Sequence, residues 1–372
     1  MVGGGPAGLA AAARARGVEV LVLEARGRLG WPPHCTGIVS PWTAETLTAT
    51  SLQGLEGEGL LEAVYDEAVV VGPRLRVACV FHGKPLAVKL RRPGVEEYLA
   101  RLAEDAGHRV QLGSPVLAVR PLRGGVEARA AGERIQARRL LLAAGANPVA
   151  RLPRPPGLQW CWRYTGLEER LLLARRLPGN VFITVHGTRL SPGFFAWLAP
   201  LGGGRRAVVG TAAPRGRGLM ARLEAAKRLL RRMGLLDWSS VEERRGGTIL
   251  RGPPAPRPVR GPIAWTGDML CASKPYTGGG LYAAAVLAGP LARLLETGDP
   301  GPLMEAYGRL RAELLAQHLA TRIAASAPRF FAALLHAACA RAERRGCTVD
   351  YDRHSSLISC LLPQPLVREE GA

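Results

Sequence analysis

The feature that most constrains the fold is a glycine-rich loop at residues 3–8, G-G-G-P-A-G, whose glycines fit the pattern G-x-G-x-x-G. An alanine-rich stretch over residues 8–16 follows, and then an apolar stretch over 18–23 that ends in Glu24. We predict a helix and a strand for these two stretches. Glycines in this order allow a tight turn and close approach of a pyrophosphate, and the acidic residue accepts hydrogen bonds from a ribose. The sequence therefore predicts a Rossmann-like α/β fold that binds a dinucleotide.

The strand that should precede this loop is nearly missing. Only Met1 and Val2 come before Gly3, whereas strands usually run about 5 to 6 residues. We interpret this as a start codon placed too far downstream. The hypothesis predicts that a chain with the upstream codons restored binds its cofactor more tightly and melts at a higher temperature. Equal behaviour of the two chains would contradict it.

A second glycine-rich loop lies near the other end of the chain. It begins at Gly267 and Asp268, and residues 274–280 continue it as K-P-Y-T-G-G-G. A strand predicted over 263–266 precedes this loop and an apolar helix follows it. Unpaired N–H groups and the positive end of a helix attract an anion. The two loops together indicate one long, doubly charged ligand that is held at both ends.

Between the loops the chain leaves the nucleotide-binding pattern, forms strands and returns to it. We therefore predict an α/β fold whose nucleotide domain is assembled from separate stretches around a strand-rich substrate domain. The expected elements are strands over 64–71, 75–90, 110–120, 126–130 and 139–143, a helix over 93–106, mainly strands over about 160–210, an amphipathic helix over 219–233, and mostly helices over the last 70 residues.

The chain is strongly basic, with 50 lysines and arginines, 30 aspartates and glutamates, and a formal net charge of +20. Nearly all of the positive charge is arginine, since the only lysines are at positions 84, 89, 227 and 274. The arginines are scattered, so a nucleic-acid partner is not expected. Two explanations stay open, a GC-rich coding bias and a surface that meets anionic lipid head groups or other polyanions.

We expect a cytoplasmic protein, because no signal peptide fits before the first loop. Residues 275–292 are uncharged, but they open with glycines and contain two prolines, so we interpret them as a buried helix rather than a membrane span. Seven cysteines form no C-x-x-C pair and the histidines lack metal-ligand spacing, so no metal site is expected. A reducing compartment disfavours disulfides, although they occur inside hyperthermophile cells. The pairing to test is Cys339 with Cys347 or Cys360.

Several motifs over roughly residues 1–300 resemble the geranylgeranyl reductase family of FAD-dependent oxidoreductases, within the p-hydroxybenzoate hydroxylase-like group. The first loop is similar to G-G-G-P-A-G-x-x-A, and residues 35–40 resemble C-x-G-x-x-S. Residues 92–99 follow the spacing R-x-x-F-D-x-x-L, with Val95 for Phe and Glu96 for Asp. Residues 192–200 resemble P-x-x-Y-x-W-x-F-P, and residues 274–282 match K-P-x-T-G-G-G-I-Y closely.

The sequence departs from the family at several positions. Met269 and Leu270 replace the two alanines of G-D-A-A, and residues 144–151 lack the Asp and Ser of A-D-G-x-x-S-x-x-R. The second departure weakens the interpretation as a hydroxylase. Phe195 and Ala199 replace Tyr and Phe of the substrate signature, which leaves the lipid open. The C-terminal 70 residues carry no motif that we can match.

The resemblance implies FAD as the cofactor. Asp268 would hydrogen-bond the ribityl or pyrophosphate region, with a helix cap as the alternative. The helix that follows Gly280 would point its positive end at flavin N1 and the C2 carbonyl. Lys274 would add to this field, or would be solvated. The implied cofactor-binding residues are Gly3, Gly5, Pro6, Ala7, Gly8, Glu24, Arg92, Gly267, Asp268, Gly278, Gly279 and Gly280.

The implied reaction is reduction of an isoprenoid double bond in lipid biosynthesis. Isolated alkenes accept hydride poorly, so hydride from flavin N5 would be paired with protonation of the neighbouring carbon. The candidate acids are Cys35, Tyr276 and Tyr282. The candidate substrate-binding residues are Phe195, Trp197 and Pro200, with ordinary core packing as the alternative. The electron donor stays open between NAD(P)H and a small electron carrier.

Two further interpretations stay open. One is an FAD-dependent monooxygenase or dehydrogenase of another apolar substrate, and the other is a basic binding protein that kept the nucleotide fold without catalysis. For the leading interpretation we predict these units along the chain. They are FAD-binding stretches at 1–63, 92–152 and 247–300, substrate-domain stretches at 64–91 and 153–246, and a C-terminal helical region at 301–372.

Overall fold

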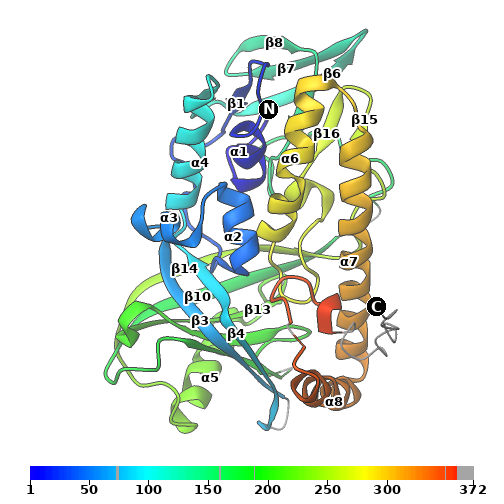
Figure 1. Ribbon diagram of the computed structural model, residues 1–372. Coiled ribbons are helices and arrows are strands. Elements are labelled where there is room, and N and C mark those ends of the chain that lie inside the picture. The colour runs from blue at the N-terminus through cyan, green and yellow to red at the C-terminus, as the bar shows by residue number, and fades with distance from the viewer. Residues whose placement is uncertain (73–74, 159–160, 188, 348, 358–372) are drawn as a thin grey trace, which may run out of the picture.

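The computed structural model describes residues 1–72, 75–158, 161–187, 189–347 and 349–357 (Figure 1). It confirms the predicted α/β class with an interrupted Rossmann-like part, a strand-rich part and C-terminal helices. In the view of Figure 1 the Rossmann-like elements occupy the upper half of the molecule and the large sheet the lower half. The site described below lies where the two halves meet.

The Rossmann-like part is built from stretches far apart in the sequence. Val2 forms single parallel bridges to Leu23 on one side and Leu142 on the other, so it holds the central position between two strand pairs. Helices α1 and α6 pack against each other next to these strands. The strands are β1 (Leu21–Leu23) parallel to β5 (Arg109–Gln111), and β9 (Leu140–Leu142) parallel to β16 (Ile263–Trp265), which pairs with β15 (Val259–Arg260). The helices are α1 (Pro6–Ala12), α4 (Gly94–Asp105) and α6 (Leu281–Thr297).

The large sheet has eight strands in the order β14-β10-β13-β12-β11-β3-β4-β2. Its neighbours are antiparallel except β11 and β3, which are parallel. Helix α5 (Leu219–Arg232) covers one face through an apolar cluster with β10, β12 and β13. The strands are β2 (Ile38–Val39), β3 (Leu61–Val71), β4 (Val77–Leu90), β10 (Trp162–Leu173), β11 (Val181–His186), β12 (Phe195–Pro200), β13 (Arg206–Pro214) and β14 (Trp238–Arg251).

The remaining elements flank these two parts. Helices α7 and α8 follow α6, and α8 contacts β4, so the C-terminal helices join the Rossmann-like part to the large sheet. The other elements are α2 (Pro41–Thr48), α3 (Leu52–Gly57), α7 (Gly301–Ser326), α8 (Pro328–Arg344), the three-stranded sheet of β6 (Val116–Leu122), β7 (Gly125–Ala130) and β8 (Glu133–Ala137), and the short helices η1 (Gly202–Gly204) and η2 (Gly267–Leu270).

The predicted boundaries differ from the observed elements at several ends. The helix expected over 8–16 ends at Ala12, and the strand expected over 18–23 begins at Leu21. The domain boundaries predicted after residues 63 and 246 fall within β3 and β14. Among the described residues, no helix combines the length and apolar character that a membrane crossing requires.

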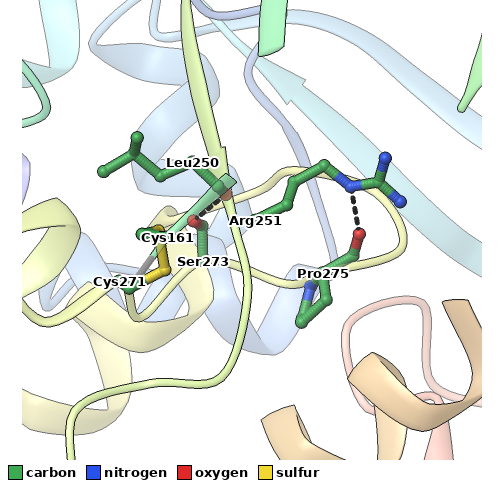
Figure 2. The surroundings of a disulfide bond; sticks show 6 residues. All are labelled: Cys161, Leu250, Arg251, Cys271, Ser273 and Pro275. Carbon is green, nitrogen blue, oxygen red and sulfur yellow. Dashed lines mark hydrogen bonds between the residues drawn. A yellow bond between two sulfur atoms is a disulfide. The ribbon is translucent and has the colours of Figure 1, made fainter. Parts of the chain in front are cut away.

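The cysteine pairing predicted from sequence is wrong. Cys339 on α8 is bonded to Cys79 on β4, with Cα atoms 5.8 Å apart, while Cys347 is free. Cys360 lies outside the described residues. A second disulfide joins Cys161 to Cys271, with Cα atoms 6.1 Å apart (Figure 2). Packing of α8 on β4 decides the first pairing, and such a contact between distant segments leaves no spacing signal in the sequence.

Candidate functional site

The first glycine loop uses its glycines in two different ways. A Cβ on Gly3 would lie 2.3 Å from the Ala143 carbonyl oxygen, and one on Gly8 would lie 2.5 Å from the Gly3 carbonyl oxygen. These two glycines therefore permit close packing of loop, helix and strand. A Cβ on Gly5 would meet nothing within 4 Å. The space beside Gly5 is open, as a phosphate-binding turn requires, and Pro6 and Ala7 then begin α1.

Glu24 lies beside this loop, as predicted. Its carboxylate accepts hydrogen bonds from the backbone N–H of Gly4, at 2.7 Å, and of Arg26, at 2.9 Å. The two bonds use different oxygens of the carboxylate, and a carboxylate has about four acceptor positions in all. Glu24 is therefore held in a defined orientation with acceptor capacity left for a ribose.

The two glycine loops meet in the folded chain. A Cβ on Gly267, whose φ is +59°, would lie 3.3 Å from Cβ of Ala7. The parallel strands β9 and β16, next to Val2, bring the second loop to the same edge of the sheet as the first. The predicted arrangement of two loops around one ligand is therefore geometrically available.

Asp268 points toward the start of α6. A Cβ on Gly280, the residue before this helix, would lie 3.8 Å from the Asp268 carboxylate. No side chain of the described residues caps this helix, so Asp268 does not act as its helix cap. Burial raises the pKa of Asp268, and His34 and Arg163 act in the opposite direction. The carboxylate accepts no hydrogen bond within the part of the chain that the structure describes.

Two buried hydroxyls in the second loop also lack partners among the described residues. They belong to Thr266, at the end of β16, and Thr277, between Tyr276 and the three glycines. Buried polar groups are nearly always hydrogen-bonded in native structures. These orphan oxygens, the uncapped α6 and the open space beside Gly5 fit a ligand with polar groups along its length.

Lys274 is neither solvated nor free. Its side chain is 2% exposed, and its ammonium forms an ion pair with the buried carboxylate of Asp352. Burial opposes ionisation of Asp352, but Lys274 holds the pKa of this carboxylate below its usual value. The sequence motif had indicated Lys274, whereas nothing in the sequence had pointed to Asp352.

Cys35 lies against the buried guanidinium of Arg92. Arg92 also forms two-pronged contacts with Glu96, four residues later on α4, including Nε–Oε2 at 2.7 Å. Burial would lower the pKa of Arg92, but Glu96 and Cys35 raise it above its usual value. The structure thus places Cys35 and Arg92, both of which the sequence indicated, side by side. The positively charged guanidinium of Arg92 contacts both Cys35 and Glu96.

An aromatic cluster lies next to the second glycine loop. Phe194 and Phe195 stack with ring centroids 4.3 Å apart, and Trp197 meets both rings edge-on. A Cβ on Gly278 would lie 3.4 Å from Phe194 and 2.6 Å from Ile249. The cluster therefore meets the loop in which the resemblance places the flavin through Phe194 and Phe195, and Trp197 packs behind these two rings.

Pro200 lies apart from this cluster. Side chains alternate along a strand, so Pro200 is on the opposite face of β12 from Phe195 and Trp197. Its carbonyl oxygen accepts a hydrogen bond from buried Tyr65, at 2.8 Å. The structure therefore brings together two of the three predicted substrate-binding residues.

The other two candidate acids, Tyr276 and Tyr282, differ from Cys35 and from each other in their surroundings. Tyr276 is packed among His186, Phe195, Phe331 and His354, and burial raises its pKa. Its hydroxyl lies 3.4 Å from Nε2 of His186. Tyr282 lies on α6 beside Trp42, and burial raises its pKa to about 12.

The sequence did not indicate His186, which contacts Tyr276, or Arg251, which binds the backbone of the loop that carries Tyr276. His186 ends a strand without a motif, and burial lowers its pKa to about 4. Arg251 is fully buried and donates to the carbonyl oxygens of Pro275 and Gly193, and Ser273 donates to the Leu250 carbonyl (Figure 2). A buried arginine at the end of a strand was the available signal, but 46 arginines on a basic chain obscured it.

Comparison with known proteins agrees with this geometry. Residues 1–38 match the model of the NAD(P)-binding Rossmann-like domain family. A search of curated protein sequences finds no significant match. A geranylgeranyl bacteriochlorophyll reductase-like protein from Thermoplasma acidophilum superposes with a TM-score of 0.77 at 18% identity, covering 97% of this chain and 94% of the other. The chain has the fold of this group of proteins.

Two other solved structures share the same fold. The p-nitrophenol 4-monooxygenase from Pseudomonas putida has a TM-score of 0.71 at 16% identity, over 97% of this chain and 95% of its own. HpxO from Klebsiella pneumoniae, solved with FAD and uric acid, has a TM-score of 0.67 at 19% identity, over 97% and 95%. These relationships extend over 97% of the chain, so they go well beyond the first 300 residues to which the sequence motifs are confined.

Proposed function

We propose that this chain is an FAD-dependent reductase of isoprenoid carbon–carbon double bonds, of the geranylgeranyl type. The observation that carries the proposal is the contact between the second glycine loop and an apolar aromatic cluster, through Gly278, Phe194 and Ile249. A prenyl chain is apolar and is recognised by such a surface. The fold of a geranylgeranyl reductase-like protein supports the same interpretation.

The residues of both loops suit the cofactor. Gly3, Gly5 and Gly8 would face the pyrophosphate, and Glu24 the adenosine ribose. Asp268 and the hydroxyl of Thr277 would hydrogen-bond polar atoms nearer the flavin, since both lack partners within the described residues. When bound, FAD supplies the hydride for the double bond.

The protein must supply a proton to the second carbon while excluding water. Tyr276 is the acid that the geometry favours, because its ring packs against Phe195 of the aromatic cluster and its hydroxyl lies 3.4 Å from Nε2 of His186. The tyrosine donates its proton, and His186 stabilises the phenolate until a proton returns from solvent. One hydride from the bound cofactor on one carbon and one proton from Tyr276 on its neighbour would balance the reduction of the double bond.

An anaerobic reoxidation experiment tests this function. The purified protein should show the absorbance spectrum of bound flavin. After reduction with dithionite and removal of the excess, a geranylgeranyl lipid should restore the oxidised spectrum with loss of a double bond from the lipid. The fully saturated lipid of the same length is the control and should leave the flavin reduced. Failure of all prenyl lipids to reoxidise the flavin would contradict the proposal.

The same protein also tests the monooxygenase alternative, for which the fold of the p-nitrophenol 4-monooxygenase is the precedent. Oxygen consumption that depends on substrate, with one oxygen atom entering the product, would favour that reaction. Flotation with anionic vesicles would distinguish a peripheral membrane contact from a coding bias as the explanation of the arginine excess. NAD(P)H or a small electron carrier would reduce the flavin between turnovers.

A further inference from the structure

Asp352 is a fully buried carboxylate that comes from a segment without any sequence motif. It lies in residues 350–357, which we call the C-terminal segment, and its side chain is 0% exposed. Four residues, from the start of α2, the second glycine loop and α7, bind this one residue. Its carboxylate accepts from the Ser40 backbone N–H at 2.8 Å, from the Thr43 hydroxyl and from the Lys274 ammonium, and its carbonyl oxygen accepts from Gln317 at 3.3 Å.

Lys274, the charged partner of Asp352, packs against the second glycine loop. The Lys274 N–H donates to the Gly279 carbonyl at 2.9 Å, and the Gly278 N–H donates to the Lys274 carbonyl at 2.7 Å. A Cβ on Gly279 would lie 2.9 Å from Cε of Lys274 and 3.5 Å from Nζ. The ammonium is therefore next to the backbone of Gly279, and the ring of Tyr351 lies 4.7 Å from it.

We infer that Asp352 is a positioning residue for Lys274, and that it holds the ammonium against Gly279 and neutralises it. The field at the flavin end of the site then comes from the backbone N–H groups at the start of α6, not from a free lysine charge. This inference rests on the proposed function, because it assumes that a flavin lies at this loop.

Lys274 and Asp352 carry opposite charges that cancel. Removal of either charge should therefore change the midpoint potential of a nearby flavin in a direction that a loss of packing would not produce. Reduction adds negative charge to a flavin, so a nearby positive charge favours the reduced form and a nearby negative charge disfavours it. Removal of Asp352 leaves a buried ammonium, and removal of Lys274 leaves a buried carboxylate. The two single variants should therefore shift the midpoint potential of the flavin in opposite directions.

The experiment measures the midpoint potential of the bound flavin by titration against a reference dye at pH 7. We expect Asp352→Asn to raise the potential and Lys274→Met to lower it, each by at least a tenfold change in the ratio of reduced to oxidised flavin, which is about 30 mV for two electrons. The double variant Lys274→Met with Asp352→Asn should return close to the wild-type value. Glu58→Gln, which breaks an exposed ion pair with Arg101, is the matched control and should cause no shift.

Shifts of the two single variants in the same direction, or no shift in either, would overturn the inference. If the single variants do not fold, the double variant decides, because removal of both charges is tolerated far better than removal of one. An unchanged potential in the double variant supports mutual neutralisation, and a shift of tenfold or more overturns it.

A measurement without flavin separates this inference from the proposed function. In flavin-free protein, the double variant should melt at a higher temperature than either single variant, because each single variant leaves one buried charge unpaired. If this coupling is present but wild-type protein binds no flavin, the proposed function fails while the ion pair stands. Melting temperatures that fall additively would show that Lys274 and Asp352 act independently, which contradicts the inference.

Discussion

Tyr276 stacks on His186, with ring centroids 5.8 Å apart, an angle of 17° between the rings and the phenol oxygen 3.4 Å from Nε2. The two residues come from opposite parts of the chain, one from the second glycine loop and the other from the end of β11. Their contact joins the loop at which we place the cofactor to the sheet that carries the aromatic cluster. The proton donor that we propose and the histidine that would stabilise its phenolate are thereby placed side by side.

Replacement of Tyr276 by phenylalanine should slow the reaction without removing the cofactor. The ring packing is kept and only the hydroxyl is lost. We expect anaerobic reoxidation of the flavin by a geranylgeranyl lipid to slow by about 10²- to 10⁴-fold, the usual contribution of a general acid. Stopped-flow absorbance measures this rate. Tyr98→Phe on α4 is the control, and equal rates for the two variants would rule out Tyr276 as the acid.

Acid should destabilise the protein through two buried histidines. Burial lowers the pKa of His186 and of His354 to about 4, and Lys274 adds to the effect on His354. An unfolded histidine titrates near 6.5, so the unfolded state takes up protons first as the pH falls. The free energy of unfolding should therefore decrease from about pH 6.5 down to about pH 4, and the two histidines should contribute no pH dependence above pH 7.

The expected size of this loss is about 2 kcal/mol for each histidine at pH 5, from about 1.4 kcal/mol for each pKa unit. Urea unfolding at pH 7 and pH 5 measures it. His186→Phe keeps an aromatic ring in the stack and should lose less stability between these two pH values than the wild type does. An equal loss in the variant and the wild type would show that His186 is not buried in its neutral form.

Alanine at two glycines of the first loop should separate cofactor binding from folding. Gly5→Ala meets no atom within 4 Å, and its φ of −83° is allowed for alanine, so the variant should fold normally but bind flavin more weakly. Gly8→Ala would place its Cβ 2.5 Å from a backbone oxygen and should lower the free energy of unfolding by about 1–3 kcal/mol. Thermal melting and flavin fluorescence measure the two effects. The assignment of Gly5 to the phosphate site would be wrong if Gly5→Ala bound flavin as tightly as the wild type.

The disulfide between Cys161 and Cys271 should stabilise the second glycine loop. It closes a loop of about 110 residues, and disulfides with loops of this size contribute about 2–5 kcal/mol. The variant Cys161→Ser with Cys271→Ser should lower the free energy of unfolding by this amount and weaken flavin binding. Cys79→Ser with Cys339→Ser is the comparison, since that bond joins α8 to β4 through no residue of the loop and should affect stability without the same loss of flavin.

Mass spectrometry of unreduced peptides checks both bonds directly. The expected cross-linked peptides contain Cys79 with Cys339 and Cys161 with Cys271, while Cys35 and Cys347 react with a thiol reagent in unfolded, unreduced protein. A peptide that joins Cys339 to Cys347 would contradict the structure.

Much of the fold was predictable because its signals are local. The pattern of glycines at 3, 5 and 8 requires conformations and close contacts that side chains would prevent, and the structure shows these contacts at Gly3 and Gly8. Alternating apolar residues at 86, 88 and 90 predicted a strand, and the amphipathic stretch that begins at Leu219 predicted a helix, with ends within two residues of those observed. The short parallel strands β1, β9 and β16 were harder to predict, since a run of three buried residues shows little periodicity.

The sequence by itself determined the Rossmann-like class, the two loops and the strand that carries Phe195 and Trp197, because each depends on residue types at short spacing. Only the tertiary structure decided which distant side chains meet. Examples are Lys274 with Asp352, Tyr276 with His186, and Cys79 with Cys339. The reason is physical: a buried charge or thiol finds its partner through the packing of elements far apart along the chain, and either partner alone has no distinguishing neighbours in sequence.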